Sequence, residues 1–250
     1  MGNSRSKVAP NPQISAETAS RGLPQTFRLS YKKGLSLKIV CYLTDPGTDV
    51  TYALSVPDAW YGGLILHDGP SIDHTPLATV TREGKGDMDF GINLPALESA
   101  GIAGGKEILR YMGTFKKEIY WFGTQVGEGD NRHIEKFEWR HSRGSEVKSI
   151  GQSGSGWKLV RLGSSIAGEG NNEVADRGDG FTKDGKEIVA VWADGKAFKS
   201  ISNIGEFQFR GSGATGELGT LWGLTAMMSY LCIWLQTMLQ ASVASGASAA

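Results

Sequence analysis

The sequence has few cysteines, few prolines and no excess of charge of either sign. Two cysteines, Cys41 and Cys232, stand far apart in a chain of 250 residues, so they can build neither a disulfide framework nor a zinc-ligand spacing. Lys and Arg total 26, and Asp and Glu total 26, which excludes the basic field typical of nucleic-acid-binding proteins. The first 24 residues contain no apolar stretch, which argues against a secretory signal peptide. These absences predict an intracellular protein with no nucleic-acid partner.

Glycine is the residue type in excess. The chain has 35 glycines in 250 residues, about twice the ordinary usage of about 7%. They follow no three-residue repeat, which excludes a collagen-like chain. A hydrophobic content of 40% excludes a wholly disordered one. Many glycines with few prolines predict many tight turns.

The zero net charge conceals two unlike parts of the chain. Residues 1–38 contain seven basic side chains against one acidic side chain, Glu17, so residues 39–250 carry the compensating negative charge. After Glu217 there is no charged residue. Both ends of the chain therefore differ in composition from its middle.

The N-terminus matches a lipidation signal. Gly2 follows Met1, and Ser6 stands at the Ser/Thr position of the N-myristoylation pattern, so we predict that Gly2 carries an acyl chain in a eukaryotic cell. One acyl chain binds a membrane only marginally and needs a second signal, which basic residues near an anionic leaflet provide. The headgroup-binding candidates are Arg5, Lys7, Lys32, Lys33, Lys116 and Lys117.

The middle of the chain is predicted to be mainly β. Residues 1–24 are polar and contain three prolines, which predicts a disordered leader. After them, short runs of β-forming residues alternate with turn residues. The twelve predicted strands are Thr26–Tyr31, Leu35–Leu43, Leu64–His67, Leu77–Arg82, Met88–Ile92, Ile108–Met112, Glu118–Thr124, His133–His141, Trp157–Leu162, Glu187–Ala193, Lys196–Ile201 and Glu206–Arg210.

Local patterns refine this prediction. Both faces of Glu187–Ala193 are almost entirely apolar, which predicts a strand covered on both sides. Asp194 and Gly195 follow it and predict a type I′ hairpin into Lys196–Ile201. The Gly/Ala-rich stretch Asn93–Gly105 predicts a short helix with a loop, and Gly163–Gly180 predicts a long exposed loop.

The C-terminal segment from Leu218 to Leu235 is apolar nearly all round. Such a helix is buried in a protein core or in lipid. Its eighteen uncharged residues reach the lower limit for a bilayer span, so a membrane span is one alternative. A closed barrel of about twelve strands, however, has an interior too wide for its own side chains to fill. We therefore predict a central barrel helix over residues 217–240 within one domain of residues 25–240, followed by a disordered tail of residues 241–250.

This order of elements resembles the tubby C-terminal-like superfamily, which includes tubby proteins, phospholipid scramblases and LURP-one-related proteins. The resemblance covers roughly residues 25–240. It rests on the strand Phe137–Arg140, the Asp194-Gly195 turn, and the strand Phe207–Arg210 leading into the apolar helix. It implies a closed twelve-stranded barrel around a C-terminal helix, and it transfers no ligand residues. A small fungal member with a lipid-attached N-terminus would have this layout.

Histidine and carboxylate residues gather at one place in the sequence. His67-Asp68 and Asp73-His74 flank a turn and could hold a metal or act as an acid and a base. A polar turn around a Gly-Pro pair explains the same residues, and we favour it. We therefore predict no catalytic residue, no metal and no cofactor.

These features together predict a non-enzymatic, lipid-interacting barrel. Its expected partner is an anionic phospholipid membrane, and its expected location is the cytoplasmic face of that membrane. Two alternatives remain open at this point. One is a soluble signalling adaptor or ligand carrier that binds a partner protein. The other is a tail-anchored or scramblase-like membrane protein.

Overall fold

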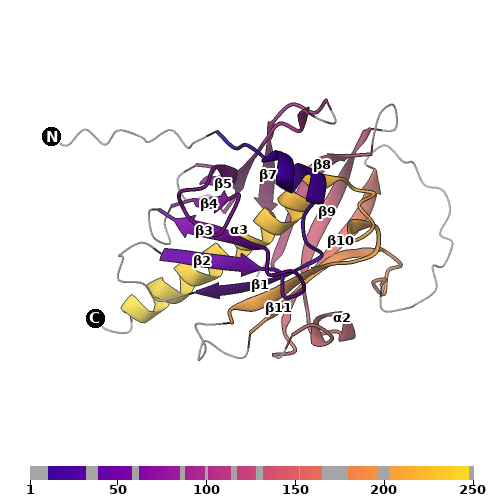
Figure 1. Cartoon of the computed structure of the whole chain (residues 1–250). Coiled ribbons are helices and arrows are strands. Elements are labelled where there is room, and N and C mark those ends of the chain that lie inside the picture. Colours follow the sequence, from indigo (N-terminus) through magenta and orange to yellow (C-terminus); the bar gives the residue numbers. More distant parts are fainter. Residues whose placement is uncertain are drawn as a thin grey trace.

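The protein is a closed barrel of twelve antiparallel strands around a C-terminal helix (Figure 1). This computed structural model describes residues 11–31, 39–57, 62–84, 88–98, 101–113, 117–127, 132–151, 153–164, 180–195 and 203–247. Each strand pairs with the next in the chain, and the last pairs with the first, with Phe27 opposite Phe207. The predicted fold class is confirmed.

The strands largely match the predicted ones. Their bounds are β1 (Thr26–Tyr31), β2 (Ile39–Thr44), β3 (Thr51–Val56), β4 (Leu64–His67), β5 (Pro76–Arg82), β6 (Phe90–Leu94), β7 (Gly105–Tyr111), β8 (Ile119–Val126), β9 (His133–Ser142), β10 (Gly156–Ser164), β11 (Ile188–Asp194) and β12 (Gly205–Phe209). Strand β3 was not predicted, although Tyr52, Leu54 and Val56 alternate as its inward-facing residues. The twelve strands of the structure include β3, and they do not include the strand predicted at 196–201, which lies outside the described residues.

Helix α3 (Thr220–Ala247) runs through the barrel. Strands β5 and β11 lie on opposite sides of the closed sheet, and α3 contacts both. Arg82 of β5 donates to Gln236 at 3.0 Å, and Trp192 of β11 stacks on Tyr230 with ring centroids 4.0 Å apart. The segment Leu218–Leu235 is therefore core of the barrel. Among the described residues, no helix combines the length and the apolarity that crossing a bilayer requires.

The boundaries of α3 differ from the predicted ones at both ends. The helix begins at Thr220, so Glu217 lies before its first turn and accepts a hydrogen bond from Arg161 instead. It continues to Ala247, so residues 241–247 are helical and the predicted disordered tail is wrong there. Alanine and serine in this stretch are compatible with helix, and a preceding long, packed helix removes the cost of nucleation.

The predicted disordered leader is also wrong for residues 11–24. They include helix α1 (Ala16–Arg21), whose N-cap Ser15 accepts from the Thr18 amide. Asp68, in the connection between β4 and β5, accepts from the Ser15 amide at 2.8 Å and from the Thr18 hydroxyl at 2.6 Å. The sequence gives no sign of this long-range anchor. Residues 1–10 lie outside the described residues.

The predicted type I′ hairpin after β11 is wrong. Asp194 pairs with Gly205 of β12, and the Gly195 amide donates to the Ile204 carbonyl at 2.8 Å. Neither Asp194 nor Gly195 has the positive φ that a type I′ turn requires, because both residues continue the ladder with β12. Residues 196–202 lie outside the described part of the chain.

The prediction that β11 is covered on both sides is confirmed. Helix α2 (Ser145–Lys148) lies over the outer face of the barrel, where Val147 packs with Ile188 and Val191 in a second, small core. The predicted short helix in Asn93–Gly105 is not an α-helix in its described residues, of which only Glu98 is helical, in a 3₁₀ turn. β6 and β7 occupy its two ends, and between them Leu97 forms a β-bridge with Ile102. Most of the predicted loop at 163–180 lies outside the described residues.

Candidate functional site

The segments that connect the strands fall into two sets that differ in charge in the sequence. Because all strands are antiparallel, their connections alternate between two ends. We call one the basic end; its connections are residues 32–38, 57–63, 83–89, 112–118, 143–155 and 195–204. We call the other the acidic end; its connections are residues 45–50, 68–75, 95–104, 127–132, 165–187 and 210–219. The sequence places ten basic and six acidic residues in the first set, and five basic and fourteen acidic residues in the second.

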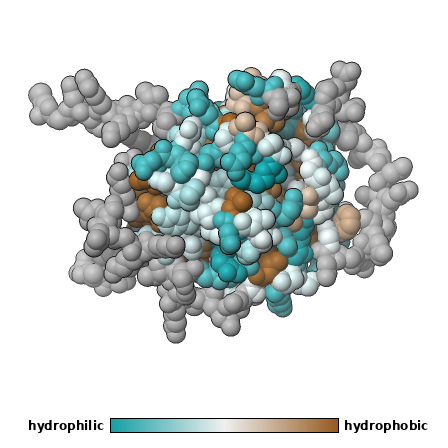
Figure 2. Space-filling model, in the orientation of Figure 1, coloured by the Kyte–Doolittle hydropathy of each residue, from teal (hydrophilic) through white to brown (hydrophobic). Residues whose placement is uncertain are grey.

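Helix α3 ends at the basic end. Its side chains are buried from Trp222 to Gln236, and from Thr237 onward most are exposed. We call residues 237–247 the helix tip. The tip has no charged residue, Met238 and Leu239 are half-buried, and Val243 is 54% exposed. In Figure 1 the tip extends past the strands, and Figure 2 shows a hydrophobic patch on the same side of the molecule, at the left edge. An uncharged helix therefore emerges among the more basic connections.

An aromatic side chain between two cations lies on the outer wall beside this end. Trp121 is the third residue of β8, which starts at the basic end. The Lys136 ammonium lies 4.1 Å from the Trp121 ring centroid, and the Arg110 guanidinium lies 5.7 Å from it. Tyr120 and Phe122 point into the core instead. The aromatic cluster around Trp121 is thus divided between the core and the surface, and the strand alternation is the signal that separates them.

The structure describes one of the predicted headgroup-binding residues. Lys117 is exposed in the connection between β7 and β8, at the basic end. Gly2, Arg5, Lys7, Lys32, Lys33 and Lys116 lie outside the described residues. In the sequence, however, the two lysines at 32 and 33 directly follow Tyr31, the last residue of β1 at the basic end. In the sequence, both predicted lysine pairs therefore fall in connections of the same set. Sequence reasoning did not single out Arg110 and Lys136.

The acidic end is held by a charged cluster centred on Arg161. Its guanidinium makes two hydrogen bonds to Glu135, at 2.6 and 2.7 Å, and donates to the Ser212 hydroxyl and Glu217, both at 3.0 Å. These bonds, with Glu135 first, raise the pKa of Arg161. Burial would raise the pKa of Glu135, but the bonds from Arg161 and His133 outweigh it and lower that pKa. The cluster ties the segment before α3 to β9 and β10.

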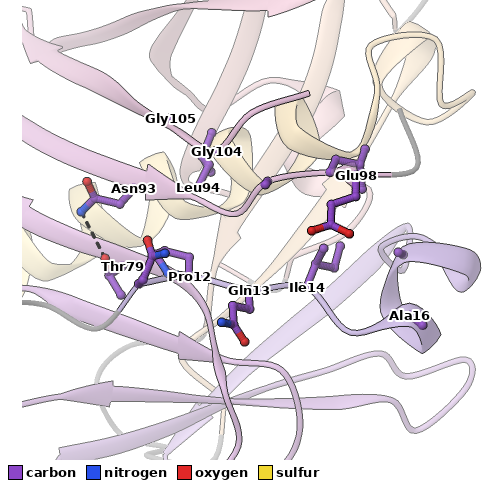
Figure 3. A pocket seen from close by; sticks show the side chains of 14 residues that line it. Pro12, Gln13, Ile14, Ala16, Thr79, Asn93, Leu94, Glu98, Gly104 and Gly105 are labelled. Atoms are coloured by element: carbon purple, nitrogen blue, oxygen red, sulfur yellow. Dashed lines mark hydrogen bonds between the residues drawn. The ribbon is translucent and has the colours of Figure 1, made fainter. Parts of the chain in front are cut away.

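A groove of about 1260 Å³ lies on the outer wall, between the leader and strands β5 and β6 (Figure 3). We call it the leader groove. Pro12, Ile14 and Ala19 form one side, and Leu97 lies on the other. Its floor contains a hydrogen-bonded pair, in which the Asn93 amide donates to the Thr79 hydroxyl at 3.1 Å. Figure 3 shows this pair directly beside Pro12.

The leader groove holds little charge. Among the described residues that line it, Glu98 is the only charged one, and its carboxylate points toward Ile14 (Figure 3). The groove is therefore a mixed surface in which small and apolar side chains surround one carboxylate. Sequence reasoning missed it, because the leader side chains on its wall were expected to be disordered.

The side chains of the histidine turn bond within the turn and to neighbouring segments. The His67 imidazole donates from Nδ1 to the His74 carbonyl at 2.9 Å, so its Nε2 accepts from the Ser55 hydroxyl, also at 2.9 Å. Asp68 is occupied by the leader, and Asp73 accepts from the Ser71 hydroxyl. Within the described ranges, no three His, Cys, Asp or Glu side chains lie together as a metal site would need. The residues hold a polar turn.

The sequence was compared with protein-family models, with curated proteins and with solved structures, and none of the three comparisons gave a significant match.

Proposed function

We propose that this protein is a tubby-like, non-enzymatic module that binds the anionic cytoplasmic face of a membrane. The basic end faces the membrane, and an acyl chain on Gly2 adds a second anchor. The observation that carries the proposal is the difference in sequence charge between the two sets of connections, with the uncharged tip of α3 emerging at the end to which the more basic set belongs. The proposed membership of the superfamily rests on the closed sheet of twelve strands around a C-terminal helix.

The energetics favour several weak contacts acting together. A basic residue close to an anionic leaflet contributes about 1 kcal/mol, and one myristoyl chain binds with a constant of about 10⁴ M⁻¹. Neither is sufficient alone. When both are on one rigid body, the second contact forms at a high effective concentration, so the affinities combine. Trp121 beside this end adds a side chain that suits the membrane–water interface.

The leader supports delivery of Gly2 to the same end. The Gln13 amide donates to the Pro76 carbonyl at the start of β5, which lies at the acidic end. Pro12 then lies beside Thr79, farther along β5 (Figure 3). From Gln13 back to Pro12, the leader therefore runs along the outer wall of the barrel toward the basic end. Residues 2–10 can span up to about 30 Å, whereas β5 is about 23 Å long.

Vesicle sedimentation tests the proposal. The acylated chain is mixed with neutral vesicles and with vesicles that contain phosphatidylserine. Lys117→Glu and Val243→Asp are each expected to weaken binding to the anionic vesicles about fivefold or more. Matched controls carry the same changes at the acidic end, Lys183→Glu and Phe181→Asp, and both side chains are exposed there. Equal effects of the two pairs, or equal binding to both vesicle types, would contradict the proposal.

A soluble ligand carrier is the second candidate function. A cavity of about 750 Å³ lies at the acidic end of the barrel, beside the first turn of α3. Its lining combines the apolar residues Leu23, Leu97 and Leu221 with three basic residues and one acidic residue, Arg21, Lys106, Arg132 and Glu107. The mouth of a barrel is a common place for a ligand, and this lining suits an amphipathic anion. Displacement of a fluorescent fatty acid, unaffected by the basic-end substitutions, would favour this candidate.

A further inference from the structure

We propose that the leader groove binds the acyl chain carried on Gly2 of the same molecule. The inference rests on the proposed function, because it takes the acylated N-terminus as its occupant. It adds to that function a binding site for the acyl chain and a way to regulate membrane binding, because the acyl chain exchanges between the groove and the membrane. The protein therefore has a state in which the acyl chain is covered and a state in which it is available.

The apolar part of the groove lining suits a hydrocarbon chain, whereas Asn11, Gln13 and Glu98 line the rest of the groove. Ile14 and Leu97 face it from opposite sides, and Ala16 and Ala19 leave room between them. On the floor the Asn93 amide donates to the Thr79 hydroxyl, and covering this pair leaves that bond intact. A polar group that is already hydrogen-bonded costs little to bury. The volume of about 1260 Å³ exceeds that of most small-molecule sites.

The position of the leader favours its own acyl chain over a foreign ligand. The described chain begins at Asn11, and Asn11 and Pro12 themselves line the groove. Residues 2–10, nine residues with a reach of about 30 Å, precede Asn11, so Gly2 can fold back to any part of the groove. The first ten residues contain Arg5 and Lys7 and no acidic residue. The groove offers them the opposite charge, Glu98.

Competition between the two sites has a measurable consequence. If the acyl chain occupies the groove in about nine-tenths of the molecules, only about one-tenth can insert it into a membrane. The apparent affinity for the membrane is then about tenfold weaker. Filling the groove removes this competition. Ala19 lines the groove and Ser20, its neighbour on α1, does not. The helix therefore offers a test position and a matched control side by side.

The experiment uses the full chain produced with and without an N-myristoyltransferase, with intact mass as the check of acylation. In the absence of membranes, methyl NMR signals of Ile14 and Leu97 are compared between the acylated chain and the Gly2→Ala chain. Shifts confined to the groove and independent of protein concentration are expected. Shifts that grow with concentration would assign the groove to a second copy, and absence of shifts would leave it without this occupant; either result overturns the proposal.

Vesicle binding gives the second readout. Ala19→Trp is expected to strengthen binding of the acylated chain about tenfold, whereas Ser20→Trp leaves it unchanged. Ala16→Trp, at an exposed groove position, repeats the test if Ala19→Trp disturbs α1. Both substitutions are expected to have no effect in the Gly2→Ala chain. This inference is overturned if neither groove substitution changes binding, or if the transferase leaves the chain unmodified. Binding through the basic end is tested separately, by the substitutions Lys117→Glu and Val243→Asp.

Discussion

The indole N–H of Trp139 donates to the hydroxyl of Ser229 across the interior of the barrel, at 2.8 Å. Both side chains are fully buried. The Ser229 hydroxyl in turn donates to the Ala226 carbonyl of its own helix. This pair fixes the rotation and height of α3 against β9, because shifting the helix would leave a buried indole without an acceptor.

Ser229→Ala is therefore expected to reduce the free energy of unfolding by about 1–3 kcal/mol, the usual cost of a buried donor left unpaired. Denaturation in urea, followed by tryptophan fluorescence, measures the change. Adding Trp139→Phe to this variant removes the unpaired donor, so the pair of substitutions is expected to cost less than the sum of the two alone. A fully additive result would contradict the role of the hydrogen bond.

Binding through the basic end is expected to depend on salt. The Gly2→Ala chain isolates the electrostatic contribution, since it has no acyl chain. Raising the ionic strength from about 0.01 M to about 0.15 M shortens the Debye length from about 30 Å to about 8 Å. Sedimentation with phosphatidylserine vesicles should then show a loss of binding of about tenfold. Binding that is insensitive to salt would point to an apolar contact alone.

The Arg161–Glu135 pair predicts a dependence of stability on pH. The pKa of Glu135 is lowered in the folded protein, so its contribution is complete above the ordinary glutamate pKa of about 4.3 and is lost as pH falls through the folded value. Glu135→Gln is expected to cost about 2–3 kcal/mol at pH 7, somewhat less than for a fully buried pair, and the difference from the native chain should shrink below about pH 4.

Thermal unfolding between pH 3 and pH 7 measures that difference. Glu206→Gln is the control, because Glu206 pairs with a half-exposed Arg28 on the outer wall. Such surface pairs contribute about 0–1 kcal/mol. A constant difference between the Glu135→Gln variant and the native chain over the whole pH range would be inconsistent with the assignment.

Asp68→Ala is expected to release the leader without unfolding the barrel. The carboxylate holds the Ser15 amide and the Thr18 hydroxyl, and it has no part in the barrel core. Hydrogen exchange of residues 13–22 should become at least about tenfold faster, with little change in the melting temperature. Asp73→Ala, which removes contacts only within its own turn, should leave the leader protected.

The two thiols are expected to be unreactive in the folded state. Cys41 and Cys232 are both buried, and burial raises the pKa of Cys41 to about 12 and that of Cys232 further still. The thiolate is the reactive form. A thiol reagent at pH 8 should modify neither cysteine in the native chain and both in the unfolded chain. Rapid modification of either thiol under native conditions would show that the barrel opens.

The regular parts of the fold could be predicted from local patterns. Strand β9 shows the alternation of Phe137 and Trp139 with charged residues, and this is enough to define both the strand and its inner face. α3 is apolar on all sides, so only a complete enclosure can bury it. The leader could not be predicted in the same way, since the partner that holds it, Asp68, lies about fifty residues away.

The sequence by itself determined the type of most elements, the apolar character of the C-terminal helix and the match of the N-terminus to an acylation pattern, because these depend on neighbouring residues and on composition. Tertiary structure alone decided which residues share a surface. Closure of the sheet divides the connections between two ends, and this places Lys117 with the tip of α3 and collects the acidic connections opposite them. It also places the leader against β5 and β6, where the leader groove forms. Which of these segments lie close together depends on the strand order and register. The net charge of the chain, which is zero, contains no information on either.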